Sequence, residues 1–145
     1  MTKTDIRFEK VTARSEQINV LFKLLSDRVH SISHQKVVSF TEHQEFVRAN
    51  IYREWFLVKL GEKYIGSFYL TNENMLGVNI PENKVELLMM PILNFIKLNY
   101  EPLVAIPSVR SDRFAINVPP SNARMSKSLQ KLGFELAQLT YYLPN

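Results

Sequence analysis

The segment from Asn122 to Phe134, NARMSKSLQKLGF, constrains the fold more than any other part of the chain. Asn122 suits a helix N-cap, because its side-chain oxygen can accept an N–H that the first turn leaves without a partner. Gly133 stands where a helix end favours a residue that tolerates positive φ. Three residues at helical spacing give the segment one apolar face: Met125, Leu129 and Leu132. The sequence therefore predicts a helix packed on a sheet, followed by a strand from Phe134 to Leu143.

The rest of the chain alternates between predicted strands and helices. Strands are expected where aromatic and β-branched residues gather, at Ile6–Val11, Glu54–Leu60, Lys63–Thr71 and Met75–Ile80. Helices are expected where apolar residues recur every three or four positions, at Glu16–His30, Phe40–Asn50 and Asn83–Asn99. The sequence leaves two candidates for a fifth strand, Leu103–Ile106 and Phe114–Val118.

Several single residues refine these expectations. Gly61 begins a hairpin turn between two strands. Gly66, inside a strand, indicates a bulge or a close approach of another backbone segment. Thr41 and Gln44 have the spacing of a capping box at the start of the second helix. Pro91 lies inside the third helix, where it removes one backbone hydrogen bond and is expected to kink or split the helix.

Composition limits the function classes. A chain of 145 residues with 46% hydrophobic residues fits one domain, residues 1–145, with one sizeable core. The chain has no cysteine, which excludes a disulfide scaffold and thiol catalysis and favours a cytoplasmic location. No apolar run is long enough to cross a bilayer, and the polar start is not a signal peptide. The net charge of +4 favours an anionic ligand, but its even spread disfavours nucleic acid.

Two pairs of residues are candidates for chemistry. His30 and His34 are four residues apart, but the Ser-Ile-Ser between them and the absence of a third nearby ligand argue against a metal site. Glu42 and His43 fall in the first turn of the second helix. Glu42 there complements the helix dipole, and contact with a substrate is the alternative.

Three stretches together resemble the GCN5-related N-acetyltransferase (GNAT) superfamily: EHQEF, the strand that contains Tyr-Ile-Gly, and NARMSKSLQKLGF. The order of the predicted elements, β-α-α-β-β-β-α-β-α-β, is also that of the superfamily. The resemblance implies an α/β (α+β) acyl-CoA N-acyltransferase-like fold, with a mixed, mostly antiparallel sheet and helices on both faces. It also implies transfer of an acetyl group from acetyl-CoA to a primary amine of a small molecule, with a nucleotide-linked amino sugar as one candidate.

The resemblance also assigns roles to residues. The backbone of the fourth strand and the start of the helix after it would hold acetyl-CoA, together with the last helix; these residues are Leu76, Val78, Ile80, Lys84, Val85, Asn122 and Ser126. The acceptor would lie against Glu42, His43, Trp55 and Tyr69, although the strand context itself favours a core position for Trp55 and Tyr69. Glu73 and His43 are the candidates for the base, and the sequence context singles out neither. No metal is implied, and a homodimer is left open.

The chain departs from the superfamily at two points. The glycine-containing phosphate loop is replaced by Pro81–Leu88, which has no glycine and places Glu82 and Glu86 where pyrophosphate would lie, with Lys84 as the opposing charge. Leu129 stands where many members carry a tyrosine that protonates the leaving thiolate. Ser126 and Ser128 are nearby hydroxyls but much weaker acids than a phenol, and Tyr141 and Tyr142 on the predicted last strand are the alternatives. These departures raise an alternative function, a catalytically inactive module that binds another ligand or a partner protein.

Overall fold

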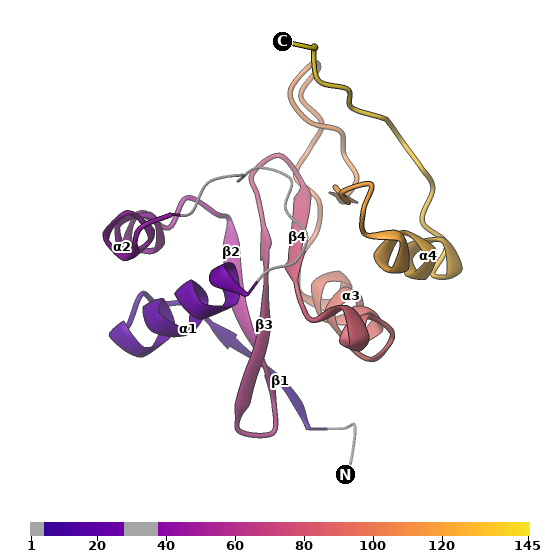
Figure 1. Cartoon of the computed structure of the whole chain (residues 1–145). Helices are drawn as coiled ribbons and strands as arrows, with labels where there is room; N and C mark the ends of the chain where they lie inside the picture. The colour runs from indigo at the N-terminus through magenta and orange to yellow at the C-terminus, as the bar shows by residue number, and fades with distance from the viewer. Residues whose placement is uncertain (1–4, 28–37) are drawn as a thin grey trace.

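The structure is a computed structural model that describes residues 5–27 and 38–145 (Figure 1). Its centre is a five-stranded sheet in the order β1-β2-β3-β4-β5. The strands are β1 (Ile6–Lys10), β2 (Glu54–Leu60), β3 (Lys63–Leu70), β4 (Met75–Asn79) and β5 (Ala115–Ile116). The first four strands are antiparallel, and β5 runs parallel to β4. The predicted mixed, mostly antiparallel sheet is confirmed.

Helices cover both faces of this sheet, as the sequence predicts. Helices α1 (Ser15–Ser26) and α2 (Phe40–Ala49) lie on one side, and α3 (Val85–Asn99) and α4 (Ala123–Lys131) lie on the other (Figure 1). Alternate residues of β2 face opposite layers, because successive strand side chains point to opposite faces. Trp55 and Leu57 pack with α1 and α2, whereas Phe56 and Val58 pack with α3.

Helix α2 begins at Phe40, as predicted, but its N-cap lies two residues before the predicted cap, Thr41. Ser39 is the N-cap: its Oγ accepts the backbone N–H of Glu42, and the Glu42 carboxylate accepts the backbone N–H of Ser39. This is a complete capping box. The predicted box of Thr41 and Gln44 is therefore wrong. Ser39 and Glu42 have the same spacing as that pair, and a charged carboxylate interacts more favourably with the positive end of the helix dipole than a neutral amide does.

Both glycine predictions for the β2–β3 hairpin hold. Gly61 has a φ of 63° in the turn. The register between β2 and β3 shifts opposite Val58 and Lys59, which marks a bulge beside Gly66. A Cβ on Gly66 would lie 2.6 Å from the carbonyl oxygen of Asn79, so the neighbouring strand approaches too closely for any other residue.

Helix α3 is continuous through Pro91, so the expected split at this residue does not occur. A short 3₁₀ turn, η1 (Glu82–Lys84), precedes it. One side of α3 packs on the sheet through Leu88, Ile92 and Ile96, and another side packs on α4. The helix therefore forms the layer between the sheet and α4.

The fifth strand lies within Phe114–Val118, and this settles the choice that the sequence left open. The other candidate, Leu103–Ile106, lies outside the sheet, and Ile106 makes an isolated bridge with Arg110. The predicted strand Phe134–Leu143 is wrong for this structure, because the segment has no strand structure. A strand needs a partner for its backbone groups, and the segment pairs with neither β5 nor any other described strand.

Candidate active site

The parallel strands β4 and β5 pair over two residues each and then part. Met75 pairs with Ala115 and Leu76 with Ile116, and the pairing stops there. Beyond the pair, β4 leads through η1 into α3, and the chain after β5 leads into α4. Both helices therefore begin at the carboxyl ends of two parallel strands. Ligands in sheets with parallel strands bind at such ends, and helix N-termini there favour anionic groups.

An apolar cluster connects the two strands with the two helices. Val85 and Met89 of α3 pack against Met125 and Leu129 of α4. Val78, Ile80, Ile116 and Val118 pack against the same cluster. Three of the residues that the sequence assigns to a cofactor, Val78, Ile80 and Val85, are therefore brought together, whereas Leu76 packs in the core under α3.

The polar residues assigned to the cofactor lie at the helix starts. The Oδ1 of Asn122 accepts the backbone N–H of Met125 at 3.2 Å, so the predicted N-cap is confirmed. Ser126 is half-buried one turn further on, and its backbone N–H donates to the Asn122 carbonyl. Lys84 is half-buried at the start of α3. Asn122 and Ser126 thus lie close together, and the Oδ1 atom of Asn122 already has a structural role.

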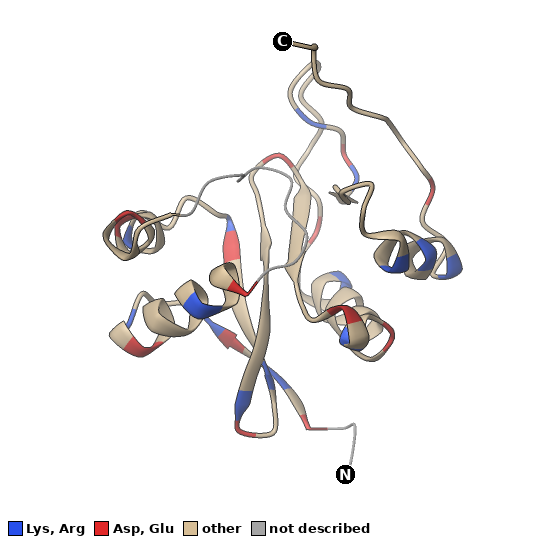
Figure 2. Ribbon diagram, viewed as in Figure 1, with Lys and Arg blue, Asp and Glu red and all other residues tan. Residues whose placement is uncertain are grey.

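An ion pair that the sequence analysis missed joins the first turns of α3 and α4. The guanidinium of Arg124 donates to both carboxylate oxygens of Glu86, with distances from 2.6 to 3.1 Å. These hydrogen bonds lower the pKa of Glu86. Figure 2 shows basic residues along α4, and α3 presents acidic residues next to it. Lys84 is therefore not the sole opposing charge at this position, because Arg124 neutralises Glu86 directly.

Aromatic side chains cover β3 and β4 on the face that carries α1 and α2. Trp55 and Tyr69 are cross-strand partners, and the ring of Tyr52 links them. Tyr52 is stacked on Tyr69 with ring centres 3.8 Å apart and meets Trp55 edge-on at 4.9 Å. The Tyr69 ring covers Gly77 so closely that a Cβ on Gly77 would overlap it. The two predicted acceptor aromatics therefore lie together, on the opposite face of the sheet from the apolar cluster.

Solved structures share the fold of this chain. The N-acetyltransferase PseH of Campylobacter jejuni matches 94% of this chain over 92% of its own length, with a TM-score of 0.63 and 19% identity. The chain has the fold of GNAT-type acetyltransferases. A structure of PseH in complex with acetyl coenzyme A matches with a TM-score of 0.62.

A protein from Clostridium difficile 630 that is described as a possible acetyltransferase has the same fold. It matches with a TM-score of 0.61 and 14% identity, over 97% of both chains. No family model and no curated protein sequence matches the chain. The acetyltransferase fold is therefore shown by structure alone, at 19% and 14% sequence identity to these two proteins.

Within this acetyltransferase fold, His43 is placed at the interface of α1 and α2. Its side chain is 5% exposed and packs against the Phe22 ring at 5.4 Å. The Nε2 atom is buried without a hydrogen-bond partner. Burial lowers the pKa of His43, and a hydrogen bond to the backbone of Ile18 opposes this effect. A neutral imidazole with an unused nitrogen suits a base, but it lies on the α1 side of α2.

The two acidic candidates, Glu42 and Glu73, lie elsewhere. Glu42 is exposed and engaged in the capping box of α2, which supports the structural interpretation of this residue. Glu73 is exposed in the turn before β4, where its backbone N–H donates to the Thr71 hydroxyl. That turn is at the opposite end of β4 from the start of α3. The structure does not bring Glu73 into contact with His43.

The loop before α3 shows how coenzyme A would fit. No residue from 81 to 88, all of them described, has a positive φ, so the 3₁₀ turn forms without glycine. Beyond Leu76, β4 offers edge backbone groups to an extended amide chain. Lys84 and Arg124 offer positive charge to phosphates, with Arg124 held by Glu86. The residues fit the pantetheine part better than the pyrophosphate.

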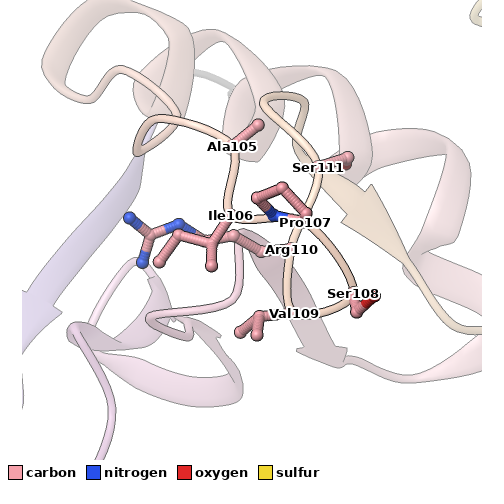
Figure 3. Close-up of a pocket in the computed structure, with 7 residues that line it drawn as sticks. All are labelled: Ala105, Ile106, Pro107, Ser108, Val109, Arg110 and Ser111. Atoms are coloured by element: carbon pink, nitrogen blue, oxygen red, sulfur yellow. The ribbon is translucent and has the colours of Figure 1, made fainter.

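Other possible sites are limited by what the structure describes. His30 and His34 lie outside the described residues. Within residues 5–27 and 38–145, no group of three potential metal-binding side chains occurs. No helix in those ranges is both long and apolar enough to traverse a bilayer. A hollow of about 440 Å³ is lined by Ala105–Ser111, in the loop before β5 and not between β4 and β5 (Figure 3).

Proposed function

We propose that this protein is an N-acetyltransferase that moves the acetyl group of acetyl-CoA to a primary amine of a small molecule. The observation that carries the proposal is the short pairing of β4 with β5. The pairing ends at Leu76 and Ile116, and α3 and α4 begin where the strands have parted. An extended thioester lying along β4 would have its phosphates near the helix starts and its acetyl group near Gly77.

The reaction needs a neutral amine close to the thioester carbonyl. The amine nitrogen attacks the carbonyl carbon, the C–N bond forms, and the C–S bond breaks. The nitrogen releases one proton to a base or water, and the thiolate takes up one proton. Tyr69 lies over Gly77, so its hydroxyl is the polar group of the aromatic face best placed to orient the amine.

The aromatic face suggests the class of acceptor. Stacked rings favour ligands with a flat face, such as a nucleobase or the apolar face of a sugar. Tyr52 and Tyr69 form such a stack, and Trp55 supports it. The Nε1 atom of Trp55 is buried and has no hydrogen-bond partner. A nucleotide-linked amino sugar combines a flat base, a sugar and a primary amine, and we propose this class as the acceptor.

A direct test follows release of the coenzyme A thiol with a panel of amines. The panel contains nucleotide-linked amino sugars, free amino sugars, polyamines and peptides, and mass spectrometry identifies the acetylated product. Tyr69→Phe should reduce turnover of the best acceptor. The matched control is Tyr100→Phe, since Tyr100 packs in the core on the α3 side of the sheet. Absence of turnover with every amine would contradict the proposal.

One observation favours a second candidate, a binding module without catalysis. Met125 and Leu129 of α4 pack against Val85 and Met89 of α3, so apolar side chains occupy the region between the helix starts. Leu129 also has no proton to give to a leaving thiolate. A module of this kind would bind acetyl-CoA or another anion without thiol release, and calorimetry together with the turnover assay separates the two functions.

A further inference from the structure

The loop between α3 and β5 is anchored to one end of the sheet. Asn74 is fully buried, and its side-chain amide donates to the carbonyls of Leu103 and Ser111 at 2.9 and 2.7 Å. Its Oδ1 atom accepts the N–H of Leu103 at 2.8 Å. Arg53 adds a further bond, from its Nη1 atom to the Glu101 carbonyl at 3.0 Å. Satisfied buried bonds of this kind favour a single conformation of the loop.

Arg110 makes another link between this loop and the sheet. Its Nε atom donates to the Val104 carbonyl at 2.7 Å, and its Nη1 atom donates to the Asn72 carbonyl at 3.0 Å. Among the described residues, no carboxylate forms an ion pair with Arg110, and its Nη2 atom donates no hydrogen bond. The neighbouring carboxylates of Glu73 and Asp112 are exposed. Neutral partners therefore orient the half-buried guanidinium, and its charge and remaining N–H donors are left for an anion.

This guanidinium lies at the same end of the sheet as the stack of Tyr52 on Tyr69. Asn72, which accepts from Arg110, follows Tyr69 by three residues. At about 3.3 Å per residue, Asn72 is within about 10 Å of Tyr69 along the chain. Arg53, which holds the start of the loop, directly follows Tyr52. The loop therefore meets the sheet next to both rings of the stack.

The hollow in this loop has apolar walls next to the charge. Ile106, Pro107 and Val109 line it together with Arg110, and the side chains of Ile106 and Arg110 extend toward the same side of the loop (Figure 3). Its volume of about 440 Å³ is within the range of about 300–1,000 Å³ that small-molecule sites occupy. An apolar surface beside a fixed guanidinium suits a nucleobase that is joined to phosphate.

We propose that Arg110 binds the phosphates of a nucleotide-linked acceptor, with the base in the hollow that Figure 3 shows. This inference rests on the proposed function. The sugar would lie on the stack of Tyr52 and Tyr69 with its amine toward Gly77, and the phosphates would extend from there to Arg110. Arginine binds phosphate through charge-assisted bonds that are both strong and geometrically specific. The phosphates of acetyl-CoA would lie at the opposite end of β4, so the two phosphate sites are separate.

Calorimetric titration with uridine and guanosine 5′-diphosphate tests this site without any turnover. We expect the unmodified protein to bind at least one of them, and Arg110→Gln to bind it about tenfold more weakly. Arg113→Gln is the matched control, because Arg113 is an exposed arginine of the same loop outside the lining of the hollow. It should bind as the unmodified protein does. Arg124→Gln should also leave this affinity unchanged, which separates the acceptor phosphates from those of coenzyme A.

Three outcomes of the titration would overturn the phosphate site. They are no binding of either nucleotide at millimolar concentration, equal affinities for Arg110→Gln and the unmodified protein, and an equal loss in Arg113→Gln. Arg110→Lys keeps the charge without the fork geometry, so it should bind more tightly than Arg110→Gln. Circular dichroism of each variant checks that the helices are retained.

Steady-state kinetics separates phosphate binding from bracing of the loop. Arg110→Gln should raise KM about tenfold for a nucleotide-linked amino sugar and leave KM unchanged for the same amino sugar without its nucleotide. A brace alone would affect both acceptors alike, and an equal change in the two KM values would refute phosphate binding. If nucleotide binding depends on Arg110 but no amine is acetylated, the phosphate site stands and the proposed function fails.

Discussion

The guanidinium of Arg124 donates three hydrogen bonds to the carboxylate of Glu86 and thereby links the first turn of α4 to the first turn of α3. The fork geometry of arginine suits carboxylates and phosphates equally well. In the proposed function, phosphates of coenzyme A lie near these same turns. Glu86 therefore binds the same guanidinium that a phosphate would bind. Phosphate binding to Arg124 would compete with the Arg124–Glu86 ion pair.

This competition predicts opposite effects for two substitutions. Glu86→Gln removes the internal anion, so adenosine 3′,5′-bisphosphate should bind about two- to tenfold more tightly. Arg124→Gln should weaken binding by a similar factor. Calorimetric titration at fixed, low salt measures both effects. Glu62→Gln is the control, since Glu62 forms a comparable exposed pair with Arg7 at the far end of the sheet. Equal affinities for all four proteins would contradict the competition.

The Schellman motif at Gly133, in which the N–H of Phe134 donates to the Leu129 carbonyl, predicts a stability effect that comes from the backbone alone. Gly133 has a φ of 92°, and a Cβ there would meet no atom within 4 Å. Gly133→Val should therefore cost about 1–2 kcal/mol, the strain of a side chain at positive φ. Gly133→Asn should cost less, because asparagine tolerates this region better. Urea denaturation measures the difference, and equal midpoints for the valine variant and the unmodified protein would exclude the strain.

Gly133 marks the boundary between a helix that the sequence predicts correctly and a strand that it predicts wrongly. The apolar spacing of Met125, Leu129 and Leu132 and the glycine after them describe local geometry, and α4 forms as expected. The strand after Gly133 is a non-local prediction, because a strand requires a partner. Neither the two-residue length of β5 nor the course of residues 134–145 can be read from the segment itself. The sequence therefore predicted the helix correctly and the strand wrongly.

The aromatic face predicts coupling between Gly77 and Tyr69. Gly77→Ala places a methyl group where the Tyr69 ring lies, so the ring must leave its stack with Tyr52, at a cost of about 1–3 kcal/mol. Replacing Tyr69 by leucine removes the obstacle. In a double-mutant cycle the two substitutions should therefore be less destabilising together than the sum of their separate effects. Strict additivity would show that the ring does not cover Gly77.

His43 predicts a dependence of stability on pH. Burial lowers the pKa of His43 in the folded protein. Below its ordinary value of 6.5, the unfolded chain binds a proton that the folded chain does not, so stability falls as the pH falls. The loss is at most about 1.4 kcal/mol per pH unit. His43→Leu should flatten the decline below about pH 6.5, since the remaining histidines are common to both proteins. Parallel declines would contradict the buried neutral imidazole.

The sequence predicts only part of the candidate site. Trp55 and Tyr69 come together because they lie in adjacent strands whose register follows from a short hairpin. Tyr52 joins them from outside the strands, and no local pattern marks it. The Arg124–Glu86 pair likewise joins residues that are 38 positions apart. Contacts of this kind depend on how helices pack over the sheet, and spacing along one segment does not encode them.

Calorimetric titration with acetyl-CoA, desulfo-coenzyme A and adenosine 3′,5′-bisphosphate tests the central claim most directly. The edge of β4 beyond Leu76 can bind the pantetheine amides, whereas the phosphates meet a glycine-free turn and an occupied arginine. We predict that acetyl-CoA and desulfo-coenzyme A bind with Kd values of about 0.1–1 mM, corresponding to about −5.5 to −4.1 kcal/mol. The bisphosphate alone should bind at least about tenfold more weakly. No detectable binding of acetyl-CoA at millimolar concentration would contradict the proposed acetyl transfer.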